Sequence, residues 1–340
     1  MPRITIKDIA RIAGVSVTTV SRALNNAPEI SEETRSRILA VCREQGYHRN
    51  LLARSLISSR THVLGIILPE IAGPFHASLS LHIETFAREQ GYQVMLCCST
   101  PDDTRINEHF DFMLSQRVDG ILLSSSSNSV YDLLSRYQSE VPLVLLGACP
   151  PEDSAVRINS VSTDNYLGGK MAAEYLYRLG HRDTIYLGMR TGSITHQRRH
   201  KGFQDTADRL GMRVLTLVNN ESSSTVECGY HLAQGIFSKP FSQTAVFTAS
   251  DMLALGTMQA ADEAGIAIPE RLSILGFDNI AYAGLPKVQL TTFSQHPESL
   301  AKAAVRLLLE RIENPEEPEY TQKLLVPSLV ERKTCRSILL

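Results

Sequence analysis

The sequence of 340 residues contains no tryptophan, and only 6% of its residues are aromatic. Its six cysteines include no CxxC pair, which favours reduced thiols over disulfides or a metal site. No apolar run approaches the roughly 18 residues that span a bilayer. Because the first eight residues lack the apolar core of a signal peptide, we expect a cytoplasmic chain with no membrane partner.

Common enzyme motifs are missing as well. The sequence has no GxGxxG, HExxH, GxSxG or phosphate-binding P-loop motif. His196 and His200 share a helical i,i+4 spacing, but no nearby carboxylate completes a metal site, which favours solvent-facing histidines. We therefore expect no catalytic residues, no metal and no cofactor.

The charge distribution divides the chain into a basic head and an acidic body. Hydrophobic residues make up 43% and charged residues 21%, as in an ordinary globular protein of two or three domains. Residues 1–60 hold ten basic and five acidic side chains, a net +5, whereas the remaining 280 hold 24 and 31, a net −7. A basic head is typical of a polyanion binder, but it also fits a solvated surface without a partner.

The head has the spacing of three short helices. Thr5, Ser16 and Ser31 are predicted N-caps of helices over 6–13, 17–25 and 32–45, and Gly14 and Gly46 are predicted to end the first and third. The predicted inner stripe of the third helix is Thr34, Ile38, Val41 and Gln45. This pattern fits a helix-turn-helix, and it also fits a small three-helix module with no DNA-binding role.

The outer face of the second predicted helix is suited to a DNA groove. Its residues at spacings of three and four are Val17, Thr18, Ser21, Arg22 and Asn25. Apart from Arg22 these side chains are short, so the helix can lie deep in a major groove, where a guanidinium fork can reach guanine O6 and N7. With the positive charge, this favours the DNA-binding interpretation.

The sequence resembles a known family at this point. The segment IKDIARIAGVSVTTVSRALN at 6–25 closely resembles the head of the lactose/galactose repressor family of bacterial transcription regulators, as does GYHRNLLARSL at 46–56. The resemblance continues to PSLVER at 327–332. It implies a helix-turn-helix head (1–48), a hinge helix with its linker (49–60) and an effector domain of two Rossmann-like α/β lobes, similar to type I periplasmic binding proteins.

The resemblance implies roles for individual head and hinge residues. Val17, Thr18 and Arg22 fall at base-reading positions, Ala53 would enter the minor groove, and Leu56 would wedge between central base pairs and kink the DNA. The full set of predicted DNA-binding residues is Thr5, Ser16, Val17, Thr18, Ser21, Arg22, Asn25, Asn50, Ala53, Arg54 and Leu56. Arg49 stands where the family usually has proline, so the hinge geometry is left open.

The body has the alternation of a two-lobed α/β protein. Short apolar runs begin near residues 63, 92, 118 and 141, and again near 184, 212, 244 and 272, with helical stretches between them. Such spacing is typical of βαβ units, and ligands bind near the carboxyl ends of their strands. We expect an N-terminal lobe from 61–162 and 293–322, a C-terminal lobe from 163–292 and 323–340, and a cleft between them.

Polar residues near the predicted strand ends suggest an effector site. The resemblance places Arg199, Asp278 and Phe75 at family effector positions, whereas Asp164 is expected to cap a helix. The predicted effector-binding residues are Phe75, Ser193, Thr195, Arg199, Ser224, Ser250 and Asp278. An arginine fork with a carboxylate suits a polyol, and an ion pair between Arg199 and Asp278 is the structural alternative.

We therefore expect a sugar-responsive repressor that binds a pseudo-palindromic operator in double-stranded DNA as a homodimer. A nucleoside, purine or sugar phosphate is the alternative effector, and a binding protein without a DNA role is the alternative function. Only six residues follow the predicted last strand motif, which is too few for a tetramerising heptad helix. The effector, its direction of action, the operator sequence and the regulated genes stay open.

Overall fold

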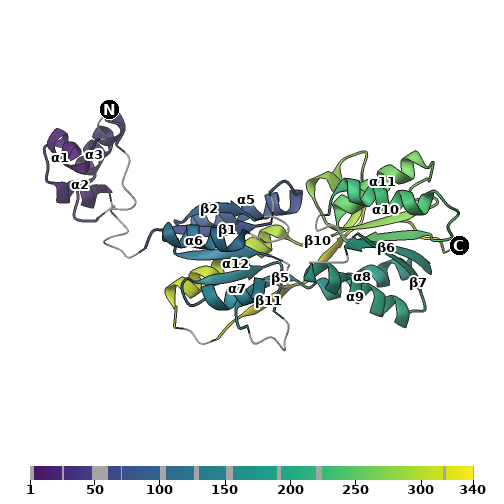
Figure 1. The fold of residues 1–340 in the computed structure, drawn as a ribbon. Coiled ribbons are helices and arrows are strands. Elements are labelled where there is room, and N and C mark those ends of the chain that lie inside the picture. The colour runs from purple at the N-terminus through teal and green to yellow at the C-terminus, as the bar shows by residue number, and fades with distance from the viewer. Residues whose placement is uncertain are drawn as a thin grey trace. The chain divides into compact units, whose positions relative to one another are not determined.

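The computed structural model describes residues 4–24, 27–47, 60–69, 71–99, 105–125, 130–150, 156–189, 193–219, 224–316 and 319–339. They belong to two compact units, Met1–Thr61 and His62–Leu340, which are described separately below (Figure 1). The predictions for Asn25, Arg49, Asn50, Ala53, Arg54 and Leu56, and with them the hinge helix, lie outside the described residues. None of the described helices is long and apolar enough to cross a membrane.

The head folds into the three predicted helices, α1 (Ile6–Ala13), α2 (Val17–Leu24) and α3 (Glu32–Glu44). Its core consists of Ile9, Ala10, Ala13, Val20, Ala23, Ile38 and Cys42. The prediction for the inner stripe of α3 was wrong at Gln45, which is an exposed C-cap residue. Cys42, one turn after Ile38, is buried in the core instead, because the helix ends before Gln45 can turn inward.

The body contains two six-stranded sheets. The first has the order β11 (Gln322–Leu325), β5 (Asn159–Thr163), β4 (Leu143–Leu146), β3 (Gly120–Ser124), β1 (Val63–Leu68) and β2 (Gln93–Cys98). The second has the order β12 (Ser328–Val330), β10 (Thr291–Ser294), β9 (Ser273–Asp278), β8 (Ala245–Thr248), β6 (Asp183–Met189) and β7 (Arg213–Asn219). The described strand pairs are parallel except β10 with β12, which confirms the α/β class.

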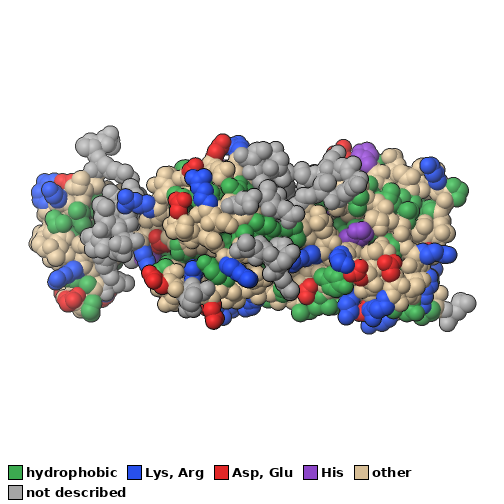
Figure 2. Space-filling view, turned by 60° about the horizontal axis from the view of Figure 1, so that its bottom comes forward, with side chains coloured by type: hydrophobic (Ala, Val, Ile, Leu, Met, Phe, Trp, Pro, Cys, Tyr) green, Lys and Arg blue, Asp and Glu red, His purple; other side chains and the backbone are tan. Residues whose placement is uncertain are grey.

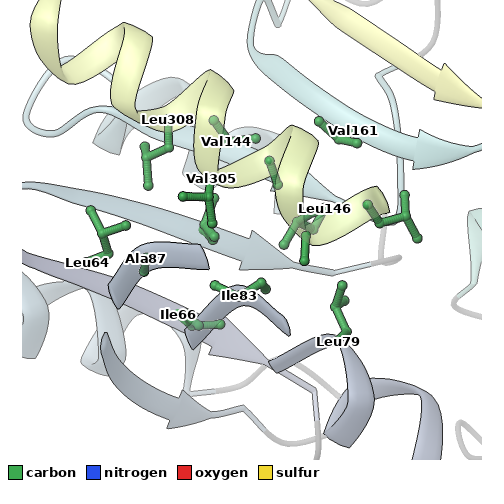
Figure 3. Close-up of a cluster of buried hydrophobic side chains, with 14 of the residues drawn as sticks. Leu64, Ile66, Leu79, Ile83, Ala87, Val144, Leu146, Val161, Val305 and Leu308 are labelled. Atoms are coloured by element: carbon green, nitrogen blue, oxygen red, sulfur yellow. The ribbon is translucent and has the colours of Figure 1, made fainter. Parts of the chain in front are cut away.

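Helices flank both sheets and bury their apolar faces. The first lobe has α5 (Pro74–Glu89), α6 (Ile106–Ser115), α7 (Val130–Tyr137) and α12 (Pro297–Glu313). The second has α8 (Asn165–Arg178), α9 (Ile194–Arg209), α10 (Val226–Phe237), α11 (Asp251–Glu263) and the 3₁₀-helix η1 (Ala281–Gly284). Figure 3 shows Ile83 of α5 and Leu308 of α12 beside Leu64 and Val144 of the first sheet, although α12 follows that sheet's first five strands by well over a hundred residues.

The chain passes between the lobes three times, after β5, β10 and β11. The predicted boundaries at 162/163, 292/293 and 322/323 all fall inside strands. The structure has the crossings a few residues later, because β10 pairs with β9 through Ser294 and β11 pairs with β5 through Leu325. At the crossings, the Asp164 amide donates to Leu325 O at 2.8 Å, and His296 Nε2 shares a 2.9 Å hydrogen bond with Ser328 Oγ.

Candidate nucleic-acid interface and ligand site

The outer face of α2 is open to solvent. Val17 is 40% exposed although it is apolar, Thr18 and Arg22 are exposed, and Ser21 is half-buried. Behind this face, Val20 and Ala23 are buried in the head core. The structure thus places four of the predicted DNA-binding residues, including the three base-reading ones, on one helix face that is open to solvent, as a groove-reading helix requires.

The two predicted DNA contacts that precede helices serve as caps. Thr5 Oγ1 accepts from the Asp8 amide and donates to the Asp8 carboxylate at 2.7 Å, and the Thr5 amide donates to the same carboxylate at 3.1 Å. These hydrogen bonds lower the pKa of Asp8. Ser16 Oγ accepts from the Thr19 amide at 3.0 Å. Both caps fix the start of a helix in the head, and both residues remain exposed.

In the body, Arg199 is the largest fully buried side chain, at 2% exposure. It comes from the second turn of α9, and its guanidinium donates to Asn165 Oδ1 at 2.6 Å and to the Ala249 carbonyl. The same group lies over the Phe277 ring, 3.5 Å from its centroid, while its Nε has no hydrogen-bond partner among the described residues. Burial lowers the pKa of Arg199, whereas the charge of Asp278 raises it.

Asp278 ends β9 close to this guanidinium. Its carboxylate accepts from Gln295 Nε2 at 2.6 Å, and within the described chain no salt bridge joins it to Arg199. Burial raises the pKa of Asp278 to about 7, Arg199 opposes that rise, and Asp251 adds to it. The structural alternative of an interlobe ion pair is therefore not what the structure shows: the two groups interact through space but have separate hydrogen-bond partners.

Asp251, the first residue of α11, completes this group of buried polar residues. It has no exposed surface, and it accepts from Thr292 Oγ1 at 2.5 Å and from the Ile280 amide at 2.9 Å. Burial raises its pKa to about 6. We call the set of Asn165, Arg199, Asp251, Asp278 and Gln295 the junction cluster. The sequence analysis did not assign Asn165, Asp251 and Gln295 to the site. Asn165 and Asp251 directly follow Asp164 and Ser250, which it did single out, and this adjacency was the only signal for them.

Four predicted hydroxyl residues lie at helix starts of the second lobe. Ser193 caps α9, accepts from the His196 amide at 3.4 Å and shares a 2.8 Å hydrogen bond with Thr195. Ser250 caps α11 and shares a hydrogen bond with Ser224. These residues therefore form two hydroxyl pairs, each at the N-terminus of a helix that also contributes to the junction cluster. Asp164 caps α8 through the Leu167 amide at 2.9 Å, as predicted.

Two apolar side chains join the lobes. Phe75, near the start of α5, packs against the first-lobe core and also against a second-lobe cluster that includes Ile280 and Leu290. Conversely Ile194, the first residue of α9, is 8% exposed and belongs to a first-lobe cluster with Tyr131 and Ile158. The residues between Ser193 and Arg199 therefore lie where the two lobes meet. Acidic and basic side chains are interspersed over the visible face of the body in Figure 2.

Comparisons with known proteins agree with both units. Residues 5–50 match the model for bacterial regulatory proteins of the lacI family, and residues 173–335 match a periplasmic binding protein-like domain. The HTH-type transcriptional repressor PurR of Pasteurella multocida is 32% identical over 335 residues, which are 98% of this chain and 99% of that protein. The ribose operon repressor of Escherichia coli is 29% identical, over 96% of this chain and 98% of that protein.

Solved structures give the same result. A LacI family transcriptional regulator from Enterococcus faecium with bound ribose has a TM-score of 0.70 and 26% identity, and it covers 82% of this chain and 100% of that one. The lac repressor dimer bound to operator and the anti-inducer ONPF shares the fold, with a TM-score of 0.86 at 24% identity over 98% of this chain and 100% of that chain. The chain therefore belongs to the LacI family of bacterial regulatory proteins, as a DNA-binding transcriptional regulator and not an enzyme.

Proposed function

We propose that this regulator is a repressor that binds a pseudo-palindromic operator as a homodimer, and that a polyol of the sugar class bound at the lobe junction changes its affinity for the operator. The observation that carries the proposal is the junction cluster. It combines a buried guanidinium, whose Nε has no hydrogen-bond partner among the described residues, with a carboxyl group of raised pKa, beside two pairs of hydroxyl side chains. Each of these groups can exchange its present hydrogen bonds for bonds to sugar hydroxyls.

The chemistry of the junction favours a polyol over a planar base. Its predicted ligand contacts include hydroxyl, guanidinium and carboxyl groups, which can pair with several hydroxyls each. Phe75 and Phe277, the aromatic side chains described there, are already packed: Phe75 between lobes, and Phe277 under the Arg199 guanidinium. One relative is a ribose operon repressor and one similar structure holds bound ribose, which supports the same class.

The head supplies the reading surface of the proposed operator complex. Val17, Thr18, Ser21 and Arg22 lie on the exposed face of α2, and a two-fold dimer presents this face twice, one helical turn of DNA apart. The proposed contacts of Asn25 and of the hinge residues Asn50, Ala53, Arg54 and Leu56 rest on sequence resemblance. Binding to chromosomal operators would bring the protein to the bacterial nucleoid, which fluorescence imaging of a tagged chain can test.

The effector class can be tested with a thermal-shift screen of the full-length protein against sugars, sugar phosphates, nucleosides and purine bases. A ligand specific for the native state raises the unfolding midpoint with its concentration. We expect ribose or another polyol to do so, and to change the mobility of a palindromic operator fragment in a gel. A response confined to purine bases or nucleosides would replace the polyol, and the absence of any operator complex would contradict the proposed function.

The assembly is tested by sedimentation at micromolar concentration. We expect one dominant dimer, because two heads related by a two-fold axis match the two half-sites of a pseudo-palindromic operator. The solved lac repressor dimer supports this expectation. A dominant tetramer, or a monomer that binds a full operator tightly, would contradict it.

A further inference from the structure

We infer that Arg198 recognises an oxyanion on the effector, so that the natural ligand is a polyol bearing a phosphate ester or a carboxylate. The inference rests on the proposed function, because it presumes that a polyol binds at the lobe junction. Arg198 is the neighbour of Arg199 in the chain and was not among the predicted effector contacts.

Arg198 lies on the side of α9 that faces the first lobe. It follows Ile194 by four residues and Thr195 by three, and such spacings make side chains neighbours on a helix. Ile194 is packed into the first-lobe core, and Thr195 belongs to one of the hydroxyl pairs. Arg198 therefore lies between the interlobe contact and the predicted sugar-binding hydroxyls.

The first-lobe groups that interact electrostatically with Arg198 are two neutral side chains, Tyr131 and Cys149. Tyr131, on the first turn of α7, is 8% exposed and donates to the Cys149 carbonyl at 3.3 Å. Burial raises the pKa of Tyr131 to about 12 and that of Cys149 above its usual value, and in both cases Arg198 opposes the rise. Asp164, the acidic group that also acts on Cys149, is committed to capping α8.

No hydrogen bond or ion pair of Arg198 exists within the described part of the chain, although the side chain is half-buried. The other arginines of the described body that are not exposed are Arg199, Arg311 and Arg332, and each of them donates at least one hydrogen bond. None of its nitrogens is among the buried side-chain atoms that lack a partner in the described chain, so the guanidinium remains accessible to water and can bind an anion directly.

The start of α9 adds to the positive potential at Arg198. The first turn of this 16-residue helix has no acidic residue, so the positive end of the helix dipole is not offset. Arginine binds phosphate and carboxylate groups through two parallel hydrogen bonds, whereas a neutral hydroxyl cannot satisfy its charge. Arg199, Asp278 and the hydroxyl pairs are then left to bind the neutral part of the same ligand.

The test compares matched ligands on the full-length protein by isothermal titration: ribose with ribose 5-phosphate, and glucose with glucose 6-phosphate and glucuronate, with inorganic phosphate alone as a further probe. We expect the anionic member of a pair to bind at least about tenfold more tightly, an advantage that shrinks as salt is added. Phosphate esters and sugar acids are thereby distinguished. Inorganic phosphate alone is expected to bind far more weakly, because it lacks the hydroxyls.

Two variants of Arg198 and one control make the assignment specific. Arg198→Met should remove the preference for the anionic ligand, and Arg198→Lys should keep part of it, because lysine retains the charge but not the fork. Lys201→Met, on the same helix, removes an exposed cation that is already paired with Asp205 at 2.7 Å, so the preference should persist.

The outcomes separate the two proposals. If neutral sugars bind as tightly as their anionic counterparts, or if Arg198→Met weakens both equally, the inference about Arg198 is wrong and the polyol site stands. If Arg198→Met instead lowers the unfolding midpoint of the ligand-free protein and leaves the preference intact, Arg198 has a partner in its own chain and the inference again fails. If no sugar of either kind binds, the proposed function itself fails.

Discussion

The buried carboxyl group of Asp278 should make the stability of the ligand-free protein depend on pH, and Asp278→Asn should remove much of this dependence. Asparagine has the same shape, and its Oδ1 can still accept the 2.6 Å hydrogen bond from Gln295. The substitution therefore removes the ionisable group from a side chain that is 9% exposed while the packing around it is kept.

The sign follows from the direction of the pKa shift. Burial raises the pKa of Asp278 from 3.8 to about 7 in the folded protein, so between these values the folded state holds a proton that the unfolded state has lost. The free energy of unfolding therefore falls as pH rises through this window, and the loss is complete above about pH 7. At about 1.4 kcal/mol per pKa unit the full loss is of the order of 4 kcal/mol. Asp251, whose pKa is raised to about 6, contributes in the same direction.

Urea unfolding of the parent and the variant at about pH 5.5 and about pH 8 measures this difference. We expect the parent to lose stability between the two pH values, and Asp278→Asn to lose at least about 1 kcal/mol less. Asp183→Asn is the control: a hydrogen bond from Arg213 lowers the pKa of Asp183, so its ionisation does not change in this window. Equal losses in the parent and Asp278→Asn would refute the reasoning, because the proton would then not be held by Asp278.

Four further predictions concern the head, the hinge and the ligand site. Arg22→Ala should cost about 1–3 kcal/mol of operator binding and relax one base position in each half-site, measured by gel shift on variant operators; equal weakening on all sequences would make Arg22 a phosphate contact. Thr5→Ala removes the N-cap of α1 and should lower the free energy of unfolding of the head by about 0.5–2 kcal/mol, seen as a lower midpoint of thermal unfolding; an unchanged midpoint would show that the cap contributes nothing. Leu56→Ala should reduce DNA bending and operator affinity with effector binding unchanged, and equal bending by variant and parent in a phasing assay would contradict the wedge. Arg199→Lys cannot reach Asn165 and Ala249 together, so ligand affinity should fall by about 1–3 kcal/mol in titration while ligand-free operator binding persists; parental affinity would refute the assignment.

Features that depend on a few consecutive residues could be predicted from the sequence. Thr5, Ser16 and Ser31 cap their helices through the amide three residues later, and Gly14 takes the left-handed conformation that ends α1. The alternation of apolar runs with helical segments likewise predicted eight strands and the two-lobed body. Such features are local, since a cap or an amphipathic period is complete within one or two turns of chain.

The composition of the proposed ligand site depended on contacts between distant parts of the chain. Gln295 reaches Asp278 because β10 lies beside β9, and Asn165 reaches Arg199 because α8 packs against α9. The sequence also left open whether Arg199 and Asp278 form an ion pair. In the folded chain each has a different hydrogen-bond partner, Asn165 for Arg199 and Gln295 for Asp278.

The helix caps, the helix-turn-helix, the alternation of strands and helices and the family resemblance could all be read from the amino-acid order alone, because each is encoded over short stretches of chain. Folding of the body was needed to establish which buried polar groups meet at the lobe junction, where the chain crosses between lobes, and that Arg198 is half-buried without a partner in the described chain. The reason is physical: the pKa of Asp278 and the surroundings of Arg198 depend on burial and on neighbours far along the chain, and these exist only once the lobes have folded and packed together.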